Sequence, residues 1–117
     1  MIAVIGASSS GIFAAWRLAQ EGHPVQLYEK EPAFQPYARR LIVTSLLFQF
    51  LSLPEDLILH QIDAFEFIAD GYRGHIQLKS PDLILERRDL IQWLATKAQK
   101  SGVELRGDGS FPASARK

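Results

Sequence analysis

The sequence of 117 residues predicts an α/β fold, with a parallel sheet of about three strands, helices and an inserted β-hairpin. Three short segments have the length of a parallel strand, and the first of them is an apolar run with branched residues that suits a buried strand. Two longer segments repeat apolar residues every three or four positions, as amphipathic helices do. Between these segments, Phe65 and Phe67 recur at the two-residue spacing of a strand before a glycine-containing turn, which is the pattern of a hairpin.

The first 28 residues predict a strand, a helix and a second strand. An apolar run covers residues 2–5 and is followed by a loop of small residues, 6–11. From Ile12 the apolar positions have a helical period, and Gly22 is placed to end that helix in a left-handed cap. Residues 25–28 are expected to form a second short strand, which ends before Glu29. This order predicts a βαβ unit with a right-handed crossover.

The segment 31–80 is expected to be an excursion toward a substrate domain that is largely absent from the chain. Two prolines indicate a loop at residues 31–40. Thr44 or Ser45 is placed to cap a short helix that runs to Leu51, because a hydroxyl oxygen there can accept from an amide of the first turn.

The hairpin is expected to follow that helix. Residues 62–69 alternate as a strand does, residues 70–74 contain the turn, and residues 75–79 form the returning strand. Another brief strand is predicted at 83–86. Packing inside the hairpin, rather than lining a substrate face, is expected for its aromatic residues, Phe65, Phe67 and Tyr72.

The C-terminal part predicts a second helix and the third parallel strand. The helix covers residues 89–101 and stops at Gly102, and the strand covers residues 103–106. Residues 1–106 are therefore expected to form one nucleotide-binding domain, followed by a flexible tail at 107–117. Packing between helices is the expected role of both tryptophans, Trp16 and Trp93.

Composition excludes several classes of function. Lys and Arg number 13, as do Asp and Glu, so the net charge of zero argues against binding to nucleic acid or to an anionic membrane. The absence of cysteine excludes disulfides and thiolate metal sites, and the three histidines lack the spacing of metal ligands. No segment has the length of an integral membrane span, and no signal peptide is recognisable, so a cytoplasmic protein is expected.

The loop between the first strand and the first helix predicts a dinucleotide site. Gly6 permits a tight turn, and Gly11 permits a close approach of helix to strand. Free amides at the helix start, over Ser9 and Ser10, would then face a pyrophosphate, helped by the helix dipole. Ser8 occupies the place of the middle glycine in the G-x-G-x-x-G pattern, where it takes up room but adds a hydroxyl. Close packing within a βαβ unit is the alternative role for the two glycines.

An acidic residue follows the second strand. Glu29 lies 23 residues after Gly6, where a carboxylate can accept hydrogen bonds from both hydroxyls of an adenosine ribose. A 2′-phosphate at that place would meet a like charge, so NADP is disfavoured. The same position at the end of a strand is also compatible with a solvated side chain.

Two segments resemble a known family. Residues 2–30 resemble the opening of FAD-dependent oxidoreductases of the glutathione-reductase type, and residues 85–105 are similar to a block of the geranylgeranyl reductase and aromatic-hydroxylase-like groups. This resemblance implies a partial Rossmann-type FAD/NAD(P)-binding fold with FAD as cofactor. It implies that Arg87 lies beside the ribityl and phosphate region of the flavin. A basic flavin contact is also implied in the loop that holds Arg39 and Arg40, but the resemblance does not decide between the two. Arg40 and Lys30 are added to the candidate residues for cofactor binding.

The resemblance also implies the function. The parent reaction would be hydride transfer through FAD to or from an organic substrate, with catalytic residues unknown. The chain lacks the later Gly-Asp segment and the substrate domain of such proteins, so we expect it to be incomplete for catalysis. A complementing chain or self-association through an open sheet edge is a further expectation. The alternatives are a NAD-binding Rossmann protein and an inactive interaction module.

Overall fold

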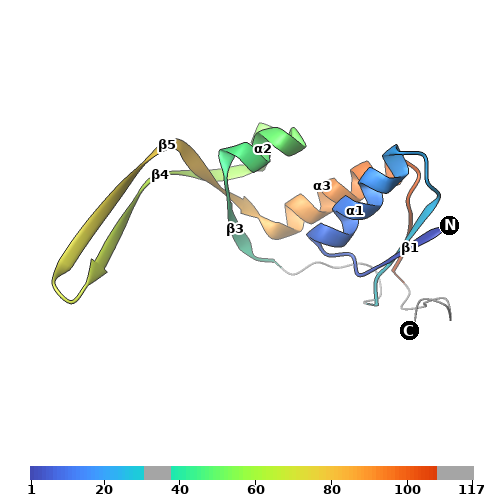
Figure 1. The fold of residues 1–117 in the computed structure, drawn as a ribbon, viewed down its shortest axis with the longest axis horizontal. Coiled ribbons are helices and arrows are strands. Elements are labelled where there is room, and N and C mark those ends of the chain that lie inside the picture. Colours follow the sequence, from blue (N-terminus) through green and yellow to red (C-terminus); the bar gives the residue numbers. More distant parts are fainter. Residues whose placement is uncertain (31–37, 108–117) are drawn as a thin grey trace. The chain divides into compact units, whose positions relative to one another are not determined.

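The computed structural model describes residues 1–30 and 38–107, which belong to two compact units (Figure 1). The first unit comprises Met1–Tyr37 and Arg88–Lys117, and the second comprises Ala38–Arg87. The predicted loop at 31–40 and the predicted tail at 107–117 lie mostly outside the described residues.

The first unit contains a parallel three-stranded sheet in the order β1-β2-β6. Two helices, α1 and α3, lie side by side in this unit (Figure 1), and α3 belongs to it from Arg88 onward. The predicted fold class is confirmed, with element boundaries close to those expected. These elements are β1 (Ile2–Ile5), α1 (Ser9–Gln20), β2 (Val25–Tyr28), α3 (Arg87–Lys100) and β6 (Glu104–Arg106).

The core of the first unit is built from the apolar faces of the two helices and one face of the sheet. Val25 and Leu27 of β2 are buried on one face of the strand, and of the two residues on its other face Gln26 is half-buried and Tyr28 is buried. Trp16 and Trp93 meet edge to face with ring centroids 5.9 Å apart, which confirms their predicted packing between helices. The fully buried side chains include Ile12, Ile91 and Leu94.

Helix α1 begins at Ser9, three residues before the predicted start at Ile12. Ser8 has extended backbone angles, φ −78° and ψ 176°, and is the residue that precedes the first helical turn. The apolar period did not reveal this turn because its residues are small or polar. The helix ends where expected, since Gly22 has a φ of +91°, which favours glycine.

The second unit contains an antiparallel sheet in the order β3-β5-β4 and a short helix. Strand β5 runs without interruption and joins the two strands predicted at 75–79 and 83–86, which corrects that prediction. Pro81 is tolerated because it lies at the irregularity where the register with β4 shifts, between the pairs Ile62–Asp82 and Ala64–Gln77. The elements are β3 (Arg40–Val43), α2 (Ser45–Leu51), a 3-10 turn (Glu55–Leu57), β4 (Ile58–Ala69) and β5 (Tyr72–Glu86).

The β4–β5 hairpin differs from the prediction in its turn and its packing. The turn consists of Asp70 and Gly71 alone, both with positive φ, rather than residues 70–74. Phe67 is 54% exposed and Tyr72 is 78% exposed, so the prediction that they pack inside the hairpin is wrong. The spacing of residues along a strand predicts which side chains share a face, but it does not predict whether that face is buried. A two-stranded ribbon has no second layer of its own to cover it.

Helix α2 begins at a confirmed cap. Thr44 Oγ1 accepts a hydrogen bond from the Leu47 amide at 3.1 Å. We expect Thr44→Ala to destabilise the second unit by about 0.5–2 kcal/mol, as loss of a capping hydroxyl does. Chemical denaturation of the chain measures this loss. Thr96→Ala is the matched control, because the Thr96 hydroxyl donates to the Gln92 carbonyl within α3 and caps nothing. Equal denaturation midpoints for the two variants would contradict the capping role.

Candidate functional site

The turn from β1 to α1 depends on two glycines. Gly6 has a φ of +99°, and its amide donates to the Tyr28 carbonyl at 2.7 Å, which ties the turn to the end of β2. A Cβ on Gly11 would lie 1.9 Å from the Gly6 carbonyl oxygen. Because that distance is far below any real contact, only glycine lets the first turn of α1 approach the end of β1 so closely. The backbone roles predicted for both glycines are therefore present.

The start of α1 presents backbone donors. The Ile12 amide makes the first intrahelical bond, to the Ser8 carbonyl at 2.9 Å, so the amides of Ser9, Ser10 and Gly11 precede the helical ladder. Ser8 makes no side-chain cap bond, and the described first turn of α1 contains no acidic residue. The three serines are exposed. The partial positive charge of this helix end is thus available to an anion from solvent.

Glu29 is joined to this turn by its carboxylate. Its Oε2 accepts from the Ala7 amide at 3.2 Å, and its Oε1 accepts from the Lys30 amide at 2.8 Å. Glu29 is half-buried, whereas Lys30 is exposed. The structure therefore brings Gly6, Glu29 and the helix start together at the carboxyl end of the parallel strands. In open α/β sheets, ligands bind at this end.

Sequence reasoning missed Ala7. Its side chain is buried and inert, and its contribution is the amide that fixes the Glu29 carboxylate. Because every residue type except proline carries a backbone amide, the identity of Ala7 does not indicate this role. The one signal in the sequence is that Ala7 directly follows Gly6. With Ala7 included, the site combines amides suited to phosphate oxygens with a carboxylate suited to hydroxyl groups.

The two predicted arginines belong to the second unit. In the antiparallel register of β3 and β5, Arg40 lies opposite Glu86. The amide of the neighbouring Arg39 donates to Glu86 Oε1 at 2.7 Å. The Arg87 amide donates to the Arg39 carbonyl at 2.6 Å. These residues therefore gather in one corner of their own unit. The contact of Arg40 and Arg87 with a cofactor stays a prediction.

Two kinds of site are not found in the part of the chain that the structure describes. Residues 1–30 and 38–107 contain no group of three or more His, Asp or Glu side chains that could hold a metal ion. Among the same residues, no helix is both long and apolar enough to cross a membrane.

The family of NAD(P)-binding Rossmann-like domains matches residues 4–36. The matched segment contains the glycine turn, helix α1, strand β2 and Glu29. This match agrees with the site assembled above and with the predicted fold, and it covers the βαβ unit rather than the whole chain.

Curated proteins are similar over most of this chain. The Putative oxidoreductase YgfK of Escherichia coli (strain K12) is 37% identical over 112 residues, covering 92% of this chain and 10% of that protein. Thiamine thiazole synthase of Desulfosudis oleivorans is 30% identical over 105 residues, covering 89% of this chain and 36% of that protein. The chain thus spans only a minor part of the curated relatives it matches.

Solved structures share the fold at low sequence identity. A geranylgeranyl bacteriochlorophyll reductase-like protein from Thermoplasma acidophilum has a TM-score of 0.75 and 20% identity, covering 89% of this chain and 28% of that one. The p-nitrophenol 4-monooxygenase PnpA from Pseudomonas putida DLL-E4 has a TM-score of 0.74 and 17% identity, covering 92% of this chain and 31% of that one. The flavin-dependent brominase Bmp2 has a TM-score of 0.72 and 19% identity, covering 91% of this chain and 28% of that one. The expected likeness to geranylgeranyl reductases and flavin-dependent enzymes is confirmed at the level of the fold.

Proposed function

We propose that this chain binds FAD and is the dinucleotide-binding part of a longer flavin-dependent oxidoreductase. The observation that carries the proposal is the hydrogen bond between Glu29 Oε2 and the Ala7 amide. This hydrogen bond holds the Glu29 carboxylate, which can accept from ribose hydroxyls, beside the turn whose amides can bind a pyrophosphate. The flavin-dependent brominase among the similar structures supports a flavin rather than another dinucleotide.

Each residue of the site has a role in this proposal. The pyrophosphate binds the amides at the start of α1, and Ser9 and Ser10 offer hydroxyl donors in addition. Ser8, in the place of the middle glycine, limits how closely the pyrophosphate approaches the backbone. Glu29 accepts from the adenosine ribose, and the exposed ammonium of Lys30 lies next to it in the chain. FAD supplies hydride transfer to or from an organic substrate when bound. By resemblance, Arg87 is the candidate contact for its ribityl and phosphate region, and Arg40 is the candidate for a further basic flavin contact.

NAD is the second candidate ligand, because the matching family is described as NAD(P)-binding. The choice of FAD rests on the second unit, Ala38–Arg87, which separates β2 from α3 by an excursion that a plain NAD-binding half does not need. We further propose a cytoplasmic location and a catalytic remainder supplied by another segment or chain.

The proposal is tested by the visible absorption spectrum of the purified chain after incubation with FAD and desalting. We expect a retained flavin spectrum that added ADP removes, because the site holds the adenosine diphosphate half of FAD. FMN is the control ligand, since it lacks that half, and it should not be retained. A folded chain, judged by circular dichroism, that retains no FAD but binds NAD would overturn the assignment in favour of the second candidate.

Ser8→Gly restores the middle glycine of the pattern. Ser8 makes no side-chain cap bond and has backbone angles open to any residue, so the substitution should cost only a few tenths of a kcal/mol in stability. We expect it to tighten FAD binding by about 2- to 10-fold, because the pyrophosphate can approach the backbone more closely. Fluorescence titration of FAD measures the change. Ser9→Gly, one position into the helix, is the control and should not tighten binding. Weaker binding by Ser8→Gly would instead make the Ser8 hydroxyl a direct phosphate donor.

A further inference from the structure

A single peptide group connects the glycine turn to strand β6. The carbonyl of Tyr28 accepts the Gly6 amide at 2.7 Å, and the amide of Glu29, in the same peptide group, donates to the Arg106 carbonyl at 2.9 Å. A displacement of β6 would therefore move the backbone that carries the Glu29 carboxylate. The alignment of β6 against β2 is part of what places that carboxylate beside Ala7.

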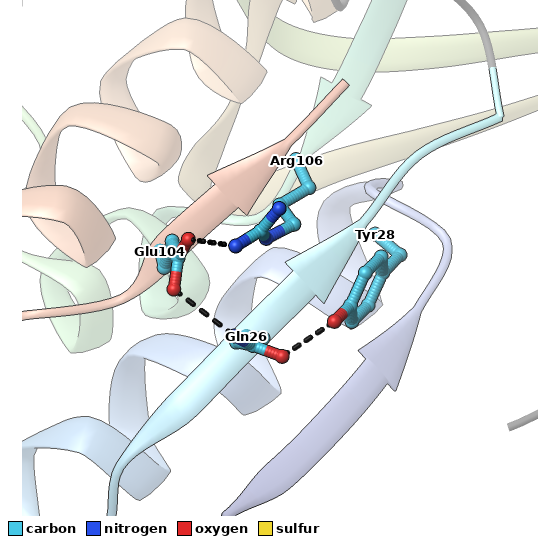
Figure 2. A network of polar contacts seen from close by, with 4 residues as sticks. All are labelled: Gln26, Tyr28, Glu104 and Arg106. Atoms are coloured by element: carbon cyan, nitrogen blue, oxygen red, sulfur yellow. Dashed lines mark hydrogen bonds and ion pairs between the residues drawn. The ribbon is translucent and has the colours of Figure 1, made fainter. Parts of the chain in front are cut away.

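Strand β6 is short, and a side-chain network supplements its backbone pairing. It pairs with β2 through Gln26–Glu104, Leu27–Leu105 and Tyr28–Arg106. Figure 2 shows the side chains of the first and last of these pairs linked in a series on one face of the sheet. Tyr28 Oη donates to Gln26 Oε1, Gln26 Nε2 donates to Glu104 Oε2 at 3.1 Å, and Glu104 Oε1 pairs with the Arg106 guanidinium at 2.6 Å.

We propose that this network, through Glu104, is a positioning device for Glu29 and hence for binding of the adenosine ribose. Glu104 makes two of the three contacts, one to its own register partner Gln26 and one to Arg106, whose carbonyl holds the Glu29 amide. The inference rests on the proposed function insofar as Glu29 must be the ribose acceptor.

The network acts locally rather than on global stability. The side chains of Glu104 and Arg106 are 51% and 42% exposed, and an ion pair so close to solvent adds little to the free energy of folding. Leu27 is buried on the opposite face of the sheet. Tyr28 is the buried member of the network, and its hydroxyl contacts Gln26 rather than Glu104, so loss of Glu104 leaves that contact in place. Loss of Glu104 would therefore loosen the register of three residues at the edge of the sheet without opening the core.

Glu104→Ala tests the proposal on the free chain, with no ligand required. We expect amide hydrogen exchange, followed by NMR, to become about 3- to 10-fold faster at Glu29 and Gly6, as loss of a hydrogen-bonded contact permits. The thermal midpoint should stay unchanged. Glu21→Ala removes the same charge from the exposed end of α1 and is the matched control. Unchanged exchange at both amides overturns the proposal, whether or not the chain binds FAD.

FAD titration separates positioning from a general weakening of the sheet. Glu104→Ala should raise the dissociation constant for FAD by about 3- to 10-fold, and Glu104→Gln, which keeps an acceptor for Gln26, should recover part of that loss. In the Glu29→Ala background the effect of Glu104→Ala should shrink below about twofold, because the positioned group is gone. An equal effect in both backgrounds overturns the proposal. A wild-type chain that binds no FAD refutes the proposed function and leaves hydrogen exchange to decide the positioning role.

Discussion

Gly11→Ala is expected to abolish detectable FAD binding and to destabilise the first unit by about 1–3 kcal/mol, the cost of inserting a methyl group into a packed site. The new Cβ would lie 1.9 Å from the Gly6 carbonyl oxygen and 3.1 Å from its carbonyl carbon. Both neighbours are backbone atoms, so neither can rotate away. Helix α1 must shift from the end of β1, and its first amides then leave the place where the pyrophosphate would bind.

Gly74→Ala is the matched control for this substitution. A Cβ there meets only Phe67 side-chain atoms at 3.7 Å, an ordinary contact, so stability and FAD affinity should stay close to those of the wild type. Thermal unfolding and fluorescence titration of both variants give the comparison. If Gly11→Ala binds FAD as the wild type does, the cofactor does not bind at the start of α1.

The glycine turn was predictable because its requirements are local. A positive φ at Gly6 and a close approach at Gly11 follow from the order of strand, turn and helix, which the sequence displays. The position of Glu29 followed from the same unit. The Ala7 amide was not predictable in this way, because every non-proline residue carries an amide and only the fold selects the one that meets the carboxylate.

The second unit shows why longer-range features were missed. Pro81 suggested a break in the chain, yet β5 continues because the proline lies at a register shift that needs no regular ladder bond. Phe67 and Tyr72 lie on the same face of the hairpin, as the two-residue spacing of a strand predicts. That spacing does not indicate whether other residues cover the face, and both side chains are exposed. For Arg40 and Arg87, residue type and position leave the ligand open, and their assignment to FAD comes from resemblance alone.

Glu29→Ala is expected to weaken FAD binding by about 1–3 kcal/mol, or roughly 5- to 150-fold, the loss associated with a missing charged acceptor in a partly buried site. Fluorescence titration measures the loss. Glu21→Ala is the control, since it removes an equal charge from an exposed position at the far end of α1 and should leave FAD affinity unchanged. Unchanged affinity in Glu29→Ala would assign the carboxylate to ordering of the turn alone.

A weaker affinity by itself leaves two explanations, because the Glu29 carboxylate also holds the Ala7 amide. Ligand discrimination separates them. If Glu29 faces the ribose, it repels a 2′-phosphate, so Glu29→Ala should weaken binding of adenosine 5′-monophosphate while weakening adenosine 2′,5′-bisphosphate less, or even strengthening it. If Glu29 only orders the turn, both ligands should lose affinity by the same factor. Since the two ligands differ only at the 2′ position, a change in the ratio of their dissociation constants places the carboxylate at the ribose.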